Sequence, residues 1–280
     1  MIRTKLGAFI KLYDVPATQF WIGAGAIGFR YGYENGTQVS LFLALIALAS
    51  VSLVLFFLMG VNDYFDVGID SQKNERAVLV KGEISMRSAR IAVGLAGALG
   101  LALALVVSIQ FFLFTLAVFI LISLYSVPPV RYKRFYPFST LGEVLGACML
   151  FFVGISLVGL PTSSAFLVST VTALVAASSR LRHEARYTEF DGKTGKRTFA
   201  VVHGAGRIKF VSRVLLVLAL VEVVAIRFAG LLTLSNALLA GLFVVTPVVV
   251  RQAQNRQYLR MTALFWGFAL YLVAVFLPSF

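Results

Sequence analysis

Three aspartates and an asparagine lie close together in residues 62–70, NDYFDVGID. If this segment is helical, Asn62, Asp66 and Asp70 are spaced four residues apart and share one face, with Asp63 beside them. Carboxylates at this spacing repel one another, so the segment needs a compensating cation. Oxygen ligands without histidine or cysteine suit Mg²⁺, which is commonly held by one or two carboxylates together with substrate phosphates. The alternative is a solvated helix end whose acids pair with the basic residues that follow, Lys73, Arg76 and Lys81.

A second acidic cluster lies in residues 182–191, RHEARYTEFD, where Glu184, Tyr187 and Asp191 would again share one helical face. The basic stretch GKTGKRT follows at residues 192–198. Its glycines permit close backbone approach, and its cations suit a phosphorylated ligand. Taken alone, this second cluster is also what an ordinary basic loop would look like. Together, the two clusters favour a lipid diphosphate whose head binds through metal and whose tail lies among helices.

The elements that position these clusters are predicted to be membrane helices. Of the 280 residues, 59% are apolar and 13% are charged, and the mean hydropathy is +0.90. Soluble domains have about 45–50% apolar and about 25% charged residues, so the composition excludes a water-soluble globule. The single cysteine, Cys148, excludes a disulfide framework. Glycines at 94, 97 and 100 are spaced to allow close helix packing. Nine apolar runs of spanning length are predicted near 15–32, 40–62, 91–108, 110–127, 139–160, 164–182, 210–226, 228–249 and 261–280.

The basic residues predict the orientation of these nine spans. All of the 25 lysines and arginines except Arg30 and Arg227 fall on the side of the N-terminus. Because Lys and Arg collect on the cytoplasmic side, we expect the N-terminus and both acidic clusters to be cytoplasmic. The net charge of +13 is then explained by orientation in the bilayer, and no nucleic-acid partner is expected. No cleavable signal-peptide pattern or linker is apparent, which favours one transmembrane domain over residues 1–280.

Several motifs of this chain resemble those of a known family. Asn62-Asp63-x-x-Asp66-x-x-x-Asp70 closely resembles the first aspartate-rich motif of the UbiA superfamily of intramembrane prenyltransferases. Residues 81–85 (KGEIS), 125–134 (YSVPPVRYKR) and 191–198 (DGKTGKRT) resemble further segments of that family, in the same order. The resemblance covers nearly the whole chain. It implies an all-α bundle of nine transmembrane helices around a central cavity, with two acidic motifs that bind a prenyl diphosphate through Mg²⁺.

The resemblance and the charge pattern together assign roles to individual residues. The implied metal ligands are Asn62, Asp63, Asp66, Asp70, Glu184 and Asp191. The implied diphosphate contacts are Lys73, Arg76, Arg131, Lys133, Lys193, Arg197 and Tyr187. The residues expected to act in catalysis are Asp66, Asp70, Asp191, Lys133 and Tyr125, the last as an aromatic face for a carbocation. One position departs from the family: Tyr187 stands where the second motif usually has an aspartate, and Glu184 or Glu189 are possible substitutes.

The predicted activity is Mg²⁺-dependent transfer of a prenyl group from a polyprenyl diphosphate donor to a lipophilic acceptor within the bilayer. An aromatic acceptor of quinone-type biosynthesis is favoured, and a glycerophospholipid precursor or an isoprenoid is an alternative. A terpene cyclase of the same fold would quench the cation internally. A transporter is a further alternative, but transport favours acids near the bilayer midplane rather than at helix ends.

Overall fold

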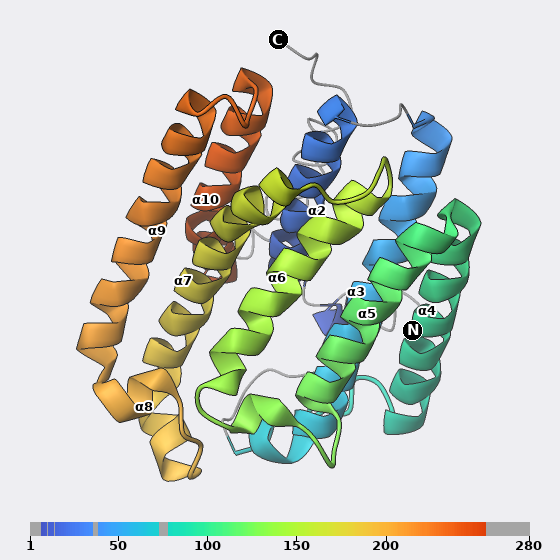
Figure 1. Cartoon of the computed structure of the whole chain (residues 1–280). Helices are drawn as coiled ribbons and strands as arrows, with labels where there is room; N and C mark the ends of the chain where they lie inside the picture. The colour runs from blue at the N-terminus through green and yellow to red at the C-terminus, as the bar shows by residue number, and fades with distance from the viewer. Residues whose placement is uncertain (1–6, 10, 14, 36–38, 73–77, 256–280) are drawn as a thin grey trace.

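The computed structural model describes residues 7–9, 11–13, 15–35, 39–72 and 78–255 of the chain. These residues contain helices and no strands, and the long helices run alternately up and down a single bundle (Figure 1). The long helices are α2 (Val15–Asn35), α3 (Leu41–Asp70), α4 (Met86–Val107), α5 (Ile109–Ser126), α6 (Phe138–Ser156), α7 (Ser163–Lys193), α9 (Ala205–Phe228) and α10 (Leu234–Asn255). The short elements are η1 (Tyr132–Arg134) and α8 (Phe199–His203).

The predicted spans coincide with these long helices, apart from the span predicted at 261–280, which lies outside the described residues. Among the described residues, five helices, α3 to α7, are long and apolar enough to cross a membrane, judged by length and composition. Two of them continue past the predicted end of the span: α3 runs on to Asp70 and α7 to Lys193. These extensions carry the two acidic clusters, so the helical spacing assumed for both clusters is confirmed.

Glycines bring neighbouring helices into close contact. A methyl group on Gly28 of α2 would lie 1.8 Å from the carbonyl oxygen of Phe151 in α6, and one on Gly154 of α6 would lie 2.0 Å from the oxygen of Gly25. The backbones of α2 and α6 therefore touch. The expectation for α4 holds at two of its three glycines, because Gly97 and Gly100 pack against α3, whereas position 94 faces open space.

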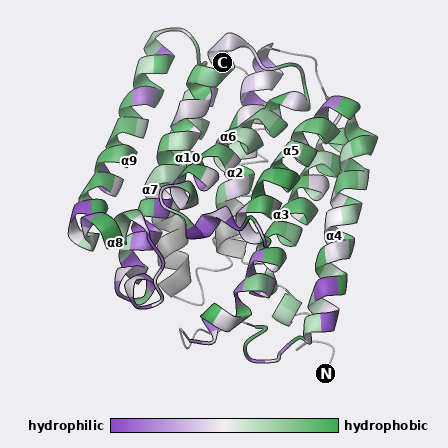
Figure 2. Ribbon diagram, turned by 60° about the horizontal axis from the view of Figure 1, so that its bottom comes forward, coloured by the Kyte–Doolittle hydropathy of each residue, from purple (hydrophilic) through white to green (hydrophobic). Residues whose placement is uncertain are grey.

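The outer surface of the bundle is apolar between its two ends. Large side chains such as Leu99, Val217 and Val221 are more than half exposed along the middle of their helices. Hydrophilic residues gather at the end of the bundle that holds α8 and the start of α4 (Figure 2). Such a surface suits lipid contact, as expected for an integral membrane protein. We call the end that carries α8 the site end.

A buried polar cluster links α2 to the start of α10 at the opposite end. Arg30, which is 1% exposed, forms a 3.0 Å ion pair with Glu34. The same carboxylate accepts hydrogen bonds from Thr233, Ser235 and Asn236. Because charges at this depth are costly unless paired, the cluster stabilises the α2–α10 contact.

Candidate active site

The connection between α5 and α6 folds back onto the last turns of α3. Arg131 adopts a left-handed backbone conformation with φ of 37°, and it is the one non-glycine residue with positive φ in the described part of the chain. This turn directs its guanidinium to the carbonyl oxygen of Phe65, at 3.0 Å, and to the carboxylate of Asp66. A left-handed conformation costs a non-glycine residue roughly 1–2 kcal/mol, which the ion pair with Asp66 helps to offset.

Lys133 joins Asn62 to Asp66 across one turn of α3. Its Nζ donates to Oδ1 of Asn62 at 2.6 Å and to Oδ2 of Asp66 at 2.7 Å. The hydroxyl of Ser126, at the end of α5, donates to the same Asn62 oxygen at 3.2 Å. The polar face predicted for α3 is therefore bound by two cations that lie more than sixty residues away in the sequence.

The site is crowded with positive charge. The pKa of Lys133 is lowered to about 8, chiefly because its ammonium group is buried. Asp66 acts in the opposite direction, and the charges of Arg131 and Lys196 lower the pKa further. A buried ammonium of this kind is poorly compensated by one carboxylate, so an additional anion would stabilise it.

The second acidic cluster reaches this region through Asp191. Its side chain is 3% exposed, and its Oδ1 lies 3.6 Å from the Nζ of Lys196. The backbone N–H of Lys196 donates to the carbonyl oxygen of Asp191 at 2.9 Å, which closes the turn after α7. The charge of Lys196 also lowers the pKa of Lys133, so Lys196 connects Asp191 electrostatically with the group formed by Lys133 and Asp66.

Glu184 lies in a different setting from the other predicted metal ligands. It is 0% exposed, and its Oε1 accepts from Ser139, Thr140 and the Nε of Arg180 at 2.9–3.2 Å. Its Oε2 accepts from the backbone N–H of Phe199 at 2.9 Å. Both oxygens are thus engaged by protein donors, and the carboxylate anchors the start of α8 to α7.

Tyr125 belongs to the same buried network. Its hydroxyl donates to Oε1 of Glu143 at 3.4 Å, and its ring packs edge-on against Tyr132 with centroids 5.2 Å apart. Arg180 donates from Nη1 to the same Glu143 oxygen at 3.0 Å. Arg180 therefore bridges two glutamates, one on α6 and one on its own helix.

The other predicted site residues lie around this centre. Asp63 and Asp70 are half-buried on the last turns of α3, and Tyr187 is half-buried with its ring 4.8 Å from that of His183. Lys193 pairs with Glu189 in a solvent-exposed ion pair, and Arg197 is exposed. The structure does not bring these two bases to Asp66. Lys73 and Arg76 lie outside the described residues.

The side-chain oxygens of Asn62 and Asp66 fit Mg²⁺ only if a bound phosphorylated ligand supplies further oxygens to complete the coordination of the metal. Within the described ranges, no three His, Cys, Asp or Glu side chains converge closely enough to hold a metal ion. Carboxylate and amide oxygens are nevertheless the donors that Mg²⁺ prefers, and it commonly keeps substrate phosphates and water as its other ligands. The residues present therefore suit a metal shared with a phosphorylated ligand.

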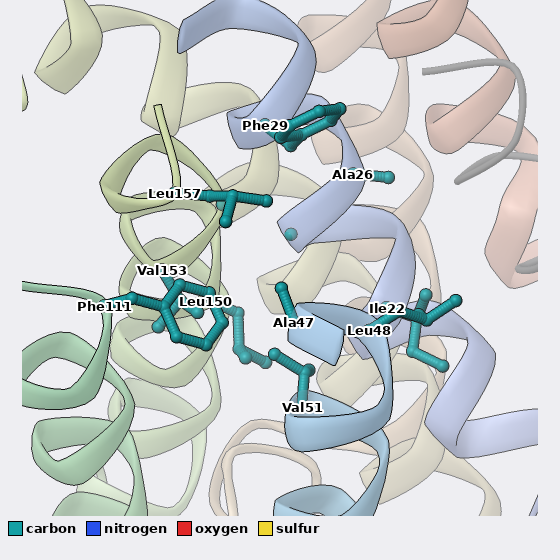
Figure 3. A pocket seen from close by; sticks show the side chains of 12 residues that line it. Ile22, Ala26, Phe29, Ala47, Leu48, Val51, Phe111, Leu150, Val153 and Leu157 are labelled. Carbon is teal, nitrogen blue, oxygen red and sulfur yellow. The ribbon is translucent and has the colours of Figure 1, made fainter. Parts of the chain in front are cut away.

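An apolar pocket lies deeper in the bundle, between α2, α3, α5 and α6 (Figure 3). Side chains from all four helices line it, including Ile22, Phe29, Val51, Phe111, Leu150 and Leu157. The residues of α3 that line it precede Asn62 by eleven or more positions, about 16 Å along the helix. The cavity measures about 30 Å³, so its lining matches an isoprenoid chain in chemistry while its volume holds about one water molecule.

Sequence reasoning missed the residues that support the site from α6 and α7. The motifs and their spacing assign no role of their own to Glu143, Arg180 or Lys196. For Glu143 and Arg180 the sequence does hold a signal, because charged residues inside apolar helices are costly and are usually paired or functional. No sequence signal identifies Ser126 or the backbone N–H of Phe199 as donors.

Comparison with known proteins gives one family and a consistent set of structures. The UbiA prenyltransferase family model matches residues 22–273. A UbiA homolog from Archaeoglobus fulgidus bound to GPP and Mg²⁺ is 22% identical, with a TM-score of 0.72 over 94% of this chain and 99% of that chain. A UbiA homolog from Aeropyrum pernix K1 is 18% identical, with a TM-score of 0.70 over 93% and 96% of the two chains. A structure of digeranylgeranylglyceryl phosphate synthase is 17% identical, with a TM-score of 0.64 over 98% of each chain. At these identities the likeness establishes the fold, and a comparison with curated protein sequences gave no significant match.

Proposed function

The chain belongs to the UbiA prenyltransferase family, and we propose that it transfers a prenyl group from a prenyl diphosphate to a lipophilic acceptor. The observation that carries this proposal is the convergence of Arg131 and Lys133 on Asn62 and Asp66. The buried Lys133 and the partly buried Arg131 and Lys196 form a positive centre at the end of an apolar bundle. That centre suits the head of a prenyl diphosphate, and the apolar interior of the bundle suits the chemistry of its tail.

In this proposal the cations exchange partners when the donor binds. Arg131 and Lys133 turn from Asp66 to the phosphate oxygens, which carry more charge than a single carboxylate. Asn62 and Asp66, with Asp63, Asp70 and Asp191, then become available to hold Mg²⁺, and we leave Glu184 out of this set because protein donors engage both its oxygens. When bound, Mg²⁺ supplies positive charge where the departing diphosphate becomes more negative. The A. fulgidus homolog bound to GPP and Mg²⁺ supports this assignment.

The transfer itself breaks one bond and forms another. The C1–O bond of the prenyl group breaks, and its electron pair leaves with the diphosphate, where Arg131, Lys133 and Lys196 stabilise the developing charge. The acceptor supplies an electron pair to C1 and releases a proton. Aromatic side chains near the site, with Tyr125 as the predicted candidate, stabilise the carbocation-like fragment without attacking it.

The finer features of the proposal follow from the sequence. We propose nine spans with the N-terminus and the site end in the cytoplasm, and a single domain over residues 1–280. An aromatic acceptor of quinone-type biosynthesis remains our preferred class, and a glycerophospholipid precursor or isoprenoid acceptor remains the alternative. Cyclisation differs from transfer in requiring no second substrate.

The test is turnover by the purified protein in lipid nanodiscs with labelled geranyl, farnesyl or geranylgeranyl diphosphate, Mg²⁺ and a panel of acceptors. We expect release of diphosphate with a prenylated product, loss of both with EDTA, and loss of both in Asp66→Ala. Glu222→Ala is the matched control, because the Glu222 carboxylate lies on α9 and contacts Thr170, away from the site end. Activity that survives EDTA or Asp66→Ala contradicts the metal-dependent mechanism, and product formation without acceptor indicates a cyclase.

A further inference from the structure

Glu143 is a carboxylate on the second turn of α6 whose two oxygens have different surroundings. Oε1 accepts from Arg180 at 3.0 Å and from Tyr125 at 3.4 Å. Oε2 has no hydrogen-bond partner among the described residues, and the side chain is 25% exposed. Glu184 provides the contrast, because its carboxylate is fully buried with donors on both oxygens. A carboxylate that served structure alone would be expected to resemble Glu184.

The orientation of Glu143 is fixed by the network behind it. Arg180 is held in turn by Glu184, with Nε to Oε1 at 3.1 Å. Glu184 is fixed by α6 through Ser139 and by α8 through the backbone N–H of Phe199. Three helices therefore determine where Glu143 points, which is the preorganisation that a binding group requires.

Along α6, Glu143 lies closer to the site end than the residues that line the apolar pocket. Its partner Tyr125 precedes Ser126, which bonds Asn62. Along α6, Glu143, Gly146 and Leu150 share one face, where Gly146 faces Trp21 of α2 and Leu150 lines the apolar pocket. The seven residues from Glu143 to Leu150 span about 10 Å. This face of α6 therefore points into the bundle, and Glu143 is the one charged residue of α6.

We propose that Glu143 binds the acceptor by accepting a hydrogen bond from a neutral hydroxyl group. The inference rests on the proposed function and narrows its acceptor class. Arg180 carries one positive charge between the two glutamates, so this group has a net negative charge, which repels a carboxylate and attracts a hydroxyl donor. The acceptor is accordingly a phenol or an alcohol without an acid group at the end that meets Glu143.

The test compares acceptor and donor kinetics in Glu143→Gln, which keeps the size of the side chain and removes its charge. Protein in nanodiscs is supplied with Mg²⁺, geranyl diphosphate and one of three hydroxyl compounds: an alkyl phenol, a long-chain alcohol or a glycerol monoether. The fully methylated form of each compound lacks the donor, and 4-hydroxybenzoate adds a carboxylate. A hydrogen bond to a charged carboxylate is stronger than one to a neutral amide, so we expect the KM for the hydroxyl acceptor to rise about tenfold in Glu143→Gln. The donor KM should stay within about twofold of wild type. The compound whose KM rises in Glu143→Gln shows whether the acceptor is a phenol or an alcohol.

Glu222→Gln is the matched control, because it makes the same change on α9. Glu222 bonds Thr170, which lies 21 residues before Asp191 on α7, about 30 Å along that helix. Glu143→Asp, which retains the charge, should restore part of the acceptor affinity, and thermal unfolding shows whether each variant is folded. Three results would overturn the inference without contradicting the proposed donor site. The first is an unchanged acceptor KM in folded Glu143→Gln, and the second is an equal change in the donor KM. The third is turnover of the donor when none of the hydroxyl compounds is prenylated. A wild-type protein that neither binds nor cleaves geranyl diphosphate contradicts the proposed function itself.

Discussion

The contact between α2 and α6 gives a prediction that depends on geometry alone. The change is Gly28→Ala, which adds one methyl group where the two helix backbones meet. An added Cβ would stand 1.8 Å from the carbonyl oxygen of Phe151, whereas ordinary contact begins at 3.4 Å. The shortfall is 3.4 − 1.8 = 1.6 Å, and the obstacle is backbone rather than a side chain that can rotate. The helices must therefore separate.

The expected cost follows from this displacement. Forcing extra volume into a packed core costs about 1–3 kcal/mol. Each kcal/mol corresponds to roughly 2–4 °C in Tm for a large domain, so we expect a loss of about 2–12 °C. Because Gly25 and Gly154 line the apolar pocket, the same displacement should widen the pocket.

The assay is thermal unfolding of the purified protein in one detergent, followed by intrinsic fluorescence and checked by size-exclusion chromatography. Gly94→Ala is the matched control: it makes the same substitution in α4, where nothing lies within 4 Å of the added methyl group. Helix propensity should make that control neutral or more stable by about 0.5–1 kcal/mol. Equal Tm values for the two variants, or a lower Tm for the control, would refute the inferred backbone contact.

Three further variants test the site. Lys133→Met removes charge-assisted hydrogen bonds worth about 1.5–3 kcal/mol, so binding of labelled donor should weaken roughly 10- to 150-fold while Lys193→Met changes little. Glu184→Ala leaves Arg180 with one carboxylate fewer in a buried site, and we expect a loss of about 3–5 kcal/mol in urea unfolding; a change below 1 kcal/mol would contradict its anchoring role. Tyr187→Asp places a second carboxylate four residues before Asp191, and we expect a lower Mg²⁺ concentration for half-maximal turnover; Tyr187→Asn should show no such effect.

The sequence by itself determined the elements and much of the chemistry. Apolar runs long enough to span a bilayer predicted the helices, because hydropathy and helix length are local properties. The spacing of Asn62, Asp66 and Asp70 predicted a shared helical face, and α3 continues to Asp70 as that required. The motifs also indicated the family that the comparison confirms.

The tertiary structure decided which side chains meet. Lys133 and Asn62 are 71 residues apart, and their 2.6 Å contact depends on a left-handed turn at Arg131 that no composition rule predicts. The sequence offered Glu184 and Asp191 as equivalent ligands on one face, yet packing against α6 and α8 engaged both oxygens of Glu184. Burial and partners arise from the packing of distant segments, so residue type and spacing can propose a metal or phosphate ligand, and only the assembled bundle decides which oxygen is available to bind it.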